Sequence, residues 1–141
     1  RHGKSAMPAK PFLDTNLWIY AHLNNPQDDR CAKAWTLINQ LSRPVISPQV
    51  LAEYYNVMLR NGQNDIWIQA NLAFMLESCE IQSLTAVIVQ RAIRLRNRYG
   101  FSYWDCQIVA AALEASCDVL YTEDLQSGQM IDDLLRVLNP I

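Results

Sequence analysis

The chain has 141 residues, of which 50% are hydrophobic and 18% are charged, and this composition excludes a disordered chain and indicates one globular domain. The formal net charge of −2 and the pI near 5.6 argue against a simple basic nucleic-acid-binding protein, although two bound divalent ions would change the net charge to about +2. No apolar run reaches the roughly 20 residues that a membrane-spanning helix needs, and we expect a cytoplasmic protein without a membrane partner.

Short apolar runs and amphipathic segments alternate along the chain. Strands that alternate with helices predict an α/β fold with a mainly parallel sheet. Ser47 and Ser102 stand at the N-cap positions of two of the helices, and Gly62 and Gly100 stand where two helices end. In chain order, we predict strand 11–13, helices 15–23 and 26–41, strand 45–46, helices 48–61 and 65–77, strand 80–84, helices 85–99 and 102–115, strand 118–122, helix 127–135 and strand 136–139.

The N-terminus and the cysteines lead to two further expectations. We interpret Met7 as the natural start, residues 1–6 as vector-derived and residues 7–141 as a single domain. The four cysteines have no C-x-x-C spacing and no histidine beside them, so we interpret them as small apolar residues rather than as zinc ligands. They are Cys31, Cys79, Cys106 and Cys117.

Two acidic residues stand at the ends of predicted strands. Asp14 follows strand 11–13 directly, and Asp124 comes shortly after strand 118–122. In open α/β sheets, ligands bind outside the carboxyl ends of the strands, so both positions are candidates for a functional site. Each position also suits a helix cap or a turn, and Glu123 competes with Asp124 for any functional role.

Two further acidic residues lie near the beginnings of predicted helices. Glu53 borders the apolar stripe of its helix, where a carboxylate costs free energy unless it has a partner or reaches solvent. Asp105 stands three positions after Ser102, which is the spacing of a capping box. The alternatives for these two residues are therefore an exposed position for Glu53 and a purely structural cap for Asp105.

The four carboxylates are more informative as a set. In a doubly wound fold, the carboxyl ends of the strands and the N-terminal ends of the helices converge on one edge of the sheet. Carboxylates that lie close together repel one another unless cations neutralise them, and oxygen ligands without His or Cys suit Mg²⁺ or Mn²⁺. Such ions orient a phosphate and stabilise the oxygens of an in-line displacement, so the set predicts phosphodiester hydrolysis.

Four short segments around these carboxylates resemble, in order, the motifs of PIN-domain nucleases. They are FLDTNLWIYA at residues 12–21, LAEYYNV at 51–57, YWDCQIVAAA at 103–112 and LYTEDL at 120–125, and VLNPI at 137–141 resembles the last strand of that family. The resemblance extends over nearly the whole chain. In its size and its lack of added parts, the chain resembles the VapC-type toxins of bacterial toxin–antitoxin pairs.

The resemblance implies a three-layer α/β fold with a five-stranded, mainly parallel sheet and helices on both faces. It implies an endoribonuclease that depends on Mg²⁺ or Mn²⁺ and cleaves single-stranded or looped RNA to a 3′-hydroxyl and a 5′-phosphate. It also implies a homodimer and a cognate antitoxin that occupies the site. The residues to which it gives a role are Asp14, Glu53, Asp105 and Asp124 as metal ligands and Thr15, Asn16 and Thr122 as polar residues that orient carboxylates or waters.

Several points stay open at the level of sequence. Arg91, Arg94 and Arg98 share one face of the predicted helix 85–99, and they are either RNA phosphate contacts or part of a solvated surface. A solitary PIN-domain RNA-processing nuclease and a catalytically silent RNA- or protein-binding PIN module are the alternative functions, and the four acidic residues disfavour the silent module. The sequence does not specify the target RNA, the antitoxin, or the kind and number of ions.

Overall fold

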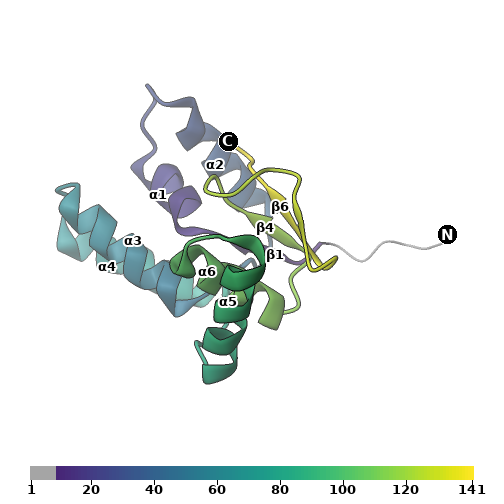
Figure 1. Cartoon of the computed structure of the whole chain (residues 1–141). Coiled ribbons are helices and arrows are strands. Elements are labelled where there is room, and N and C mark those ends of the chain that lie inside the picture. The colour runs from purple at the N-terminus through teal and green to yellow at the C-terminus, as the bar shows by residue number, and fades with distance from the viewer. Residues whose placement is uncertain (1–8) are drawn as a thin grey trace.

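One mixed sheet of six strands lies at the centre of the structure, a computed structural model that describes residues 9–141 (Figure 1). The strand order is β3–β2–β1–β4–β6–β5, and every neighbouring pair is parallel except β5–β6. The expected start at Met7 lies outside the described residues. The strands are β1 (Pro11–Leu13), β2 (Val45–Ile46), β3 (Glu80–Ile81), β4 (Val119–Tyr121), β5 (Met130–Ile131) and β6 (Leu135–Leu138).

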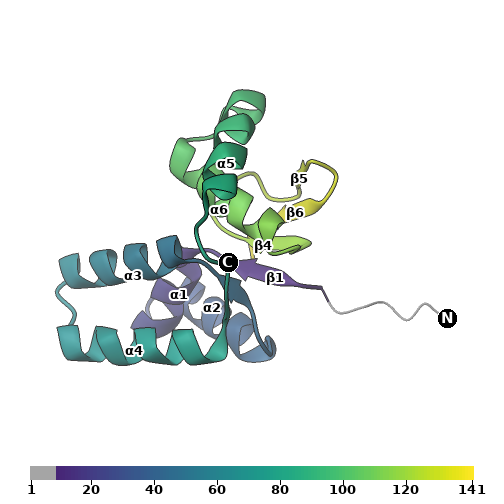
Figure 2. The same ribbon diagram turned by 90° about the horizontal axis from the view of Figure 1, so that it is seen from below.

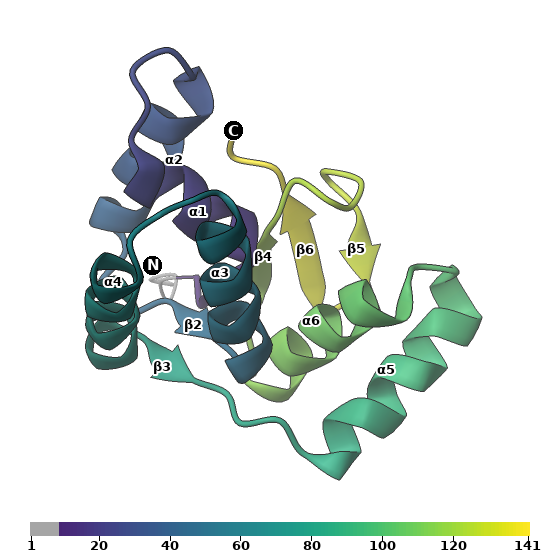
Figure 3. The same ribbon diagram turned by 90° about the vertical axis from the view of Figure 1, so that its left-hand side faces the viewer.

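Helices cover both faces of this sheet. α1 and α2 lie on one side, α5 and α6 lie on the other, and α3 and α4 form a side-by-side pair near β2 and β3 (Figure 2, Figure 3). This arrangement is the three-layer α/β architecture that the sequence predicts. The helices in the described part of the chain are α1 (Thr15–Leu23), α2 (Asp29–Gln40), α3 (Pro48–Arg60), α4 (Asp65–Ser78), α5 (Ala86–Tyr99) and α6 (Tyr103–Glu114).

The predicted bounds agree best with the structure at the beginning of the chain, where β1, α1 and β2 have the predicted residues. α2 begins later than predicted because Asp28 caps it, with its side chain accepting a hydrogen bond from the Arg30 backbone N–H at 3.0 Å. The third predicted strand is shortened to two residues, Glu80–Ile81.

The predicted helix over 127–135 is wrong, because these residues form turns and the strand β5 instead. Gly128, Asp132 and Asp133 have φ values of 92°, 50° and 58°, which interrupt a right-handed helix and reverse the chain. Tyr99 of α5 stabilises the reversal at Asp132 and Asp133. Its hydroxyl donates to Asp132 Oδ1 at 2.9 Å and accepts from the Asp132 backbone N–H at 2.8 Å. The resulting antiparallel strand makes the sheet six-stranded, whereas five strands were expected.

Ser47 also differs from its predicted role. It directly precedes α3, but its side chain makes no capping hydrogen bond. Its Oγ is buried and has no partner among the described residues, and the side chain lines a cavity of about 10 Å³ together with Gln107. A cavity of this size has room for about one water molecule, which would satisfy the hydroxyl. Ser102, by contrast, caps α6 as predicted: its Oγ accepts from the Asp105 backbone N–H at 3.2 Å.

The core lies between the sheet and its covering helices. α6 is the most deeply buried helix, with every residue from Cys106 to Leu113 buried. The four cysteines are buried and unpaired, as predicted for small apolar residues. In the part of the chain that the structure describes, no helix has the length and apolar character to cross a membrane.

The carboxyl ends of the two central strands determine where the site lies. β1 and β4 are paired in parallel with Leu13 opposite Tyr121, so Asp14 and Thr122 leave the sheet at the same level. The Asp14 backbone N–H still donates to the Tyr121 carbonyl at 3.0 Å, which extends the ladder by one bond. The first sequence motif is thus brought against the fourth, although about 100 residues separate them along the chain.

Candidate active site

Asp14 is the most buried acidic residue of the site, with 6% of its surface exposed. It is the N-cap of α1, and its Oδ1 accepts from the Thr15 backbone N–H at 2.7 Å. Its Oδ2 accepts from the Thr122 hydroxyl at 2.8 Å. The cap and the functional role that the sequence left as alternatives are therefore compatible, since both oxygens are held while the carboxylate still lines a pocket.

The environment of Asp14 opposes its negative charge. The pKa of this carboxyl is raised from its ordinary 3.8 to about 7, mainly by burial; the charges of Asp124 and Glu53 act in the same direction, and the hydrogen bonds from Thr122 and Thr15 oppose them. With this pKa, the carboxyl keeps its proton in a large fraction of the molecules at neutral pH, and a nearby positive charge would favour its charged form. A perturbed carboxyl in a pocket is a common feature of functional sites.

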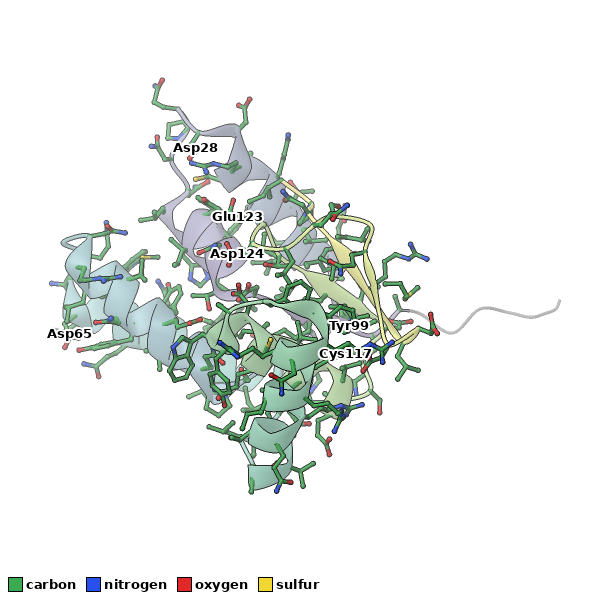
Figure 4. All side chains as sticks on the ribbon, viewed as in Figure 1. Asp28, Asp65, Tyr99, Cys117, Glu123 and Asp124 are labelled. Carbon is green, nitrogen blue, oxygen red and sulfur yellow. The ribbon has the colours of Figure 1, made fainter. Side chains whose placement is uncertain are left out.

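Asp124 and Glu123, both labelled in Figure 4, are adjacent in sequence but have different hydrogen-bond partners. Asp124 lines the pocket, and both of its carboxylate oxygens lie 3.3–3.5 Å from the Asn16 side-chain nitrogen. Burial raises the pKa of Asp124, and the charges of Asp105 and Glu123 act in the same direction. Glu123 instead accepts a hydrogen bond from the Tyr20 hydroxyl at 2.8 Å. The geometry therefore places Asp124 at the site and gives Glu123 a structural partner.

Glu53 comes from the second turn of α3 and is held at both oxygens. The Thr15 hydroxyl donates to its Oε1 at 2.7 Å, and the Gln49 side-chain nitrogen donates to its Oε2 at 3.2 Å. Thr15 also donates its backbone N–H to Asp14, so this one residue contacts two of the four carboxylates. The sequence left an exposed edge position as the alternative for Glu53, and the structure shows a half-buried carboxylate with two donors.

Asp105 stands in the first turn of α6. Its backbone N–H is capped by Ser102, while the residue itself lines the same pocket as Asp14, Glu53 and Asp124. Capping and a place in the pocket are again compatible. Structure thus brings all four predicted carboxylates, from four separate stretches of sequence, to one cavity.

This cavity has a volume of about 270 Å³ and lies at the carboxyl edge of the sheet. Arg60 is the one cationic side chain among the described residues that line it. Three polar lining residues were not singled out by sequence analysis, namely Gln49, Asn56 and Arg60. They stand four residues before and three and seven residues after Glu53, so the helical period of α3 around Glu53 is the signal that would have found them. The full lining is Asp14, Thr15, Asn16, Gln49, Glu53, Asn56, Val57, Arg60, Asp105, Ile108 and Asp124.

The supporting residues expected from the resemblance contact the carboxylates directly. Thr122 donates to Asp14, Thr15 to Glu53, and Asn16 to Asp124. Thr122 is itself nearly fully buried, and its hydroxyl also accepts from the Asp124 backbone N–H at 3.0 Å. One threonine therefore connects the carboxylates that follow β1 and β4.

The three arginines of α5 that the sequence suggested as RNA contacts lie outside the cavity lining. Neither Arg91, Arg94 nor Arg98 is among the described residues that line the cavity. Arg91 pairs with Glu114 and Arg98 pairs with Asp132, both at 3.4 Å, while Arg94 is exposed. A role of these arginines in RNA binding stays a prediction, and the structure gives two of them acidic partners of their own.

The donor set of the cavity fits a hard divalent cation. Its potential ligands are carboxylate, amide and hydroxyl oxygens, with no His or Cys among the described lining residues, which favours Mg²⁺ or Mn²⁺ over Zn²⁺. Within residues 9–141, however, no three His, Cys, Asp or Glu side chains are gathered as a preformed metal site.

A comparison with models of protein families identifies the family of this chain. The family model described as the PIN domain matches residues 12–129, which is most of the chain. The chain belongs to the PIN domain family. No curated protein sequence matches it at a significant level. The PIN match begins in β1 and ends just before β5, so it includes all four carboxylates.

Solved structures share the fold of this PIN domain at low sequence identity. VapC20 of Mycobacterium tuberculosis, a sarcin–ricin loop cleaving toxin, superposes with a TM-score of 0.68 at 22% identity over 82% of this chain and 90% of that one. A toxin–antitoxin complex from Klebsiella pneumoniae gives 0.70 at 19% identity over 94% and 98%. VapBC2 from Rickettsia felis, bound to a DNA fragment from its promoter, gives 0.65 at 21% identity over 92% and 98%. At these identities the likeness establishes the fold.

Proposed function

We propose that this PIN domain is a divalent-metal-dependent endoribonuclease of the VapC toxin type. The observation that carries the proposal is the convergence of Asp14, Glu53, Asp105 and Asp124 on one cavity without a neutralising side chain for each charge. The fold likeness to VapC20, a toxin that cleaves an RNA loop, supports RNA as the substrate. The expected products are a 3′-hydroxyl and a 5′-phosphate.

The chain's own residues would prepare the site for a phosphodiester. Mg²⁺ or Mn²⁺, held by the four carboxylates, would supply positive charge and lower the pKa of a water molecule. Thr122 and Thr15 keep the Asp14 and Glu53 oxygens in place before the substrate arrives. Arg60 lies about two helical turns after Glu53 on α3 and lines the same cavity. From there it would contact a neighbouring phosphate of the RNA.

The proposed partners follow from the relatives of the fold. The Klebsiella and Rickettsia structures are toxin–antitoxin assemblies, which supports a cognate antitoxin for this chain as well. The homodimer and the cytoplasmic location that the sequence led us to expect stay predictions. A solitary RNA-processing nuclease has the same chemistry but no antitoxin, so co-purification with the product of an adjacent small gene separates these two functions.

The direct test is cleavage of a mixed RNA pool by wild-type protein and by Asp14→Asn. We expect cleavage in Mg²⁺ or Mn²⁺ and none in excess chelator, and we expect Asp14→Asn to be inactive while it stays folded by circular dichroism. The matched control is Asp29→Asn, a change of the same kind at an exposed residue in the first turn of α2. Full activity of Asp14→Asn contradicts the proposed role of the carboxylates. Inactivity of the wild type in every metal contradicts the proposal and favours a catalytically silent binding module.

A further inference from the structure

Gln49, in the first turn of α3, connects two of the four carboxylate-bearing segments. Its side-chain nitrogen donates to Glu53 Oε2 at 3.2 Å and to the backbone carbonyl of Trp104 at 3.1 Å. Trp104 is the residue before Asp105, so a single amide group ties the helix that carries Glu53 to the helix that carries Asp105. Sequence analysis gave Gln49 no role.

The orientation of this amide is determined by two residues of α6. The Tyr103 hydroxyl donates to Gln107 Oε1 at 2.8 Å, and the Gln107 side-chain nitrogen donates to Gln49 Oε1 at 2.9 Å. A carboxylate and a backbone carbonyl only accept hydrogen bonds, so the Gln49 nitrogen must face them and its oxygen must face Gln107. The donors therefore run in one direction, from Tyr103 through Gln107 and Gln49 to Glu53.

Gln107 lies in the core, where a side-chain amide costs free energy unless its oxygen and its nitrogen both have hydrogen-bond partners. It is 6% exposed, and its neighbours Cys106 and Ile108 are buried apolar residues. A buried amide without partners costs about 1–3 kcal/mol, and an apolar residue would pack there without that cost. Both ends of the Gln107 amide are occupied by Tyr103 and Gln49. Its position in the core is thus explained by the orientation it gives Gln49.

Like charges on α3 and α6 make such a connection useful. Glu53 and Asp105 line one cavity, and two carboxylates at close range repel each other until a cation is bound. Thr15 already holds Glu53 Oε1 from the side of α1, and Gln49 holds the other oxygen from within α3. The two donors together leave Glu53 little freedom to turn away from the cavity.

We propose that Gln49 is a positioning residue, oriented by Gln107 and Tyr103, that sets Glu53 relative to Asp105 for binding a divalent cation. This inference rests on the proposed function, because it gives the cation-binding carboxylates their geometry. It assigns no contact with RNA to any of the three residues.

The test compares Gln49→Leu, Gln107→Leu and the double variant by calorimetric titration with Mn²⁺ in the absence of RNA. We expect Gln49→Leu to weaken Mn²⁺ affinity about 10–100-fold, as loss of a residue that orients a ligand does. Gln107→Leu should weaken it less. Because Gln107 acts through Gln49, the double variant should be no weaker than Gln49→Leu, which is a non-additive result. Tyr103→Phe, which removes one hydroxyl, should reproduce the effect of Gln107→Leu.

The matched control is Gln69→Leu on α4, where the glutamine nitrogen donates to Asp65 at 2.7 Å far from the cavity lining. It should bind Mn²⁺ like the wild type. Melting curves without metal identify variants that fail to fold, and Gln49→Met then replaces Gln49→Leu. Wild-type affinity in folded Gln49 variants, or additive losses, overturns this inference alone. A wild type that neither binds Mn²⁺ nor cleaves RNA overturns the proposed function and the inference with it.

Discussion

Four acidic residues outside the cavity have cationic partners, whereas the four inside it have none among the described residues. Asp28, Glu80, Glu114 and Asp132 each form an ion pair, with Arg30, Lys10, Arg91 and Arg98 respectively. Asp14, Glu53, Asp105 and Asp124 form no ion pair within residues 9–141, and hydroxyl and amide donors hold the first two and Asp124 instead.

Asp132 and Asp14 show the difference most clearly. Each aspartate accepts a hydrogen bond from a hydroxyl group and lies at a reversal or a strand end. Asp132 adds the Arg98 guanidinium and thereby joins α5 to the β5–β6 turn. Asp14 has the Thr15 backbone N–H and no cation beside it among the described residues, and burial together with the charges of Asp124 and Glu53 raises its pKa. The first arrangement is complete as it stands, and the contrast supports the proposal that the second takes a cation from outside the chain.

The largest expected effect is on RNA cleavage, which should depend on the acidic residues inside the cavity and not on the ion-paired ones outside it. Asp105→Asn should lower kcat/KM for RNA cleavage by about 10³-fold, as removal of a group that stabilises the transition state does. Asp132→Asn should leave cleavage nearly unchanged, because this residue lies in the β5–β6 turn and asparagine tolerates its φ of 50°. Both variants are measured on the same RNA in the same metal buffer. Equal losses in the two variants would break the comparison.

A pH-dependent effect on stability should follow from Asp14. Its folded pKa of about 7 lies above its unfolded value of 3.8, so the folded metal-free protein retains a proton that the unfolded chain loses. Stability should therefore fall as pH rises from 3.8 to about 7, by about 4 kcal/mol in all for this residue. Asp14→Asn removes this loss, and urea unfolding at pH 5 and pH 8 in chelator should show it more stable than wild type at pH 8.

Urea unfolding of a variant of the ion-paired residue Asp132 provides the contrast with Asp14. Asp132→Asn should lower stability by about 1 kcal/mol, because it weakens the contacts with Tyr99 and Arg98. A metal-free Asp14→Asn protein that is less stable than wild type at pH 8 would show that the Asp14 carboxylate is compensated within the chain.

An intermediate effect should come from Thr122. Thr122→Val keeps the shape of the side chain but removes the hydroxyl that donates to Asp14 and accepts from Asp124. Cleavage should fall about 10–100-fold, the usual loss when a group that orients a metal ligand is removed. Thr122→Ser restores the hydroxyl and should recover most of the activity. A serine variant as weak as the valine variant would indicate packing rather than orientation.

Arg60 should give the smallest effect, and on binding rather than on chemistry. Arg60→Ala should reduce the slope of log affinity for RNA against log salt by about one phosphate contact, measured with an inactive Asp14→Asn background. Arg94→Ala on α5 is the matched surface control, since Arg94 is exposed and does not line the cavity. A larger change of slope for Arg94→Ala would place the RNA on α5, the site that the sequence suggested.

Sequence alone predicted correctly those elements whose bounds are determined by neighbouring residues. The apolar run before Asp14 and the caps Ser102 and Gly100 specify β1, α6 and the end of α5 through neighbouring residues alone. The choice of Asp124 over Glu123 needed Tyr20, which is 103 residues away and binds Glu123. Such a pairing follows from how the layers pack, which no local pattern contains.

Two other features depended on distant residues in the same way. The reversal at Asp132 and Asp133 is held by Tyr99, so the segment before it looked helical when considered alone. The connection of Gln49 with Gln107 joins positions 58 residues apart, and only the packing of α3 against the start of α6 brings the two amides together.

The central claim is that the carboxylate cavity requires a cation that the chain does not supply. Calorimetric titration of chelator-treated protein with Mn²⁺ at pH 8 tests it most directly, with wild type, Asp14→Asn and Asp132→Asn side by side. The account predicts Mn²⁺ binding by the wild type and by Asp132→Asn and its loss in Asp14→Asn. Equal binding by the wild type and Asp14→Asn, or RNA cleavage by the wild type in the absence of any divalent metal, would contradict it.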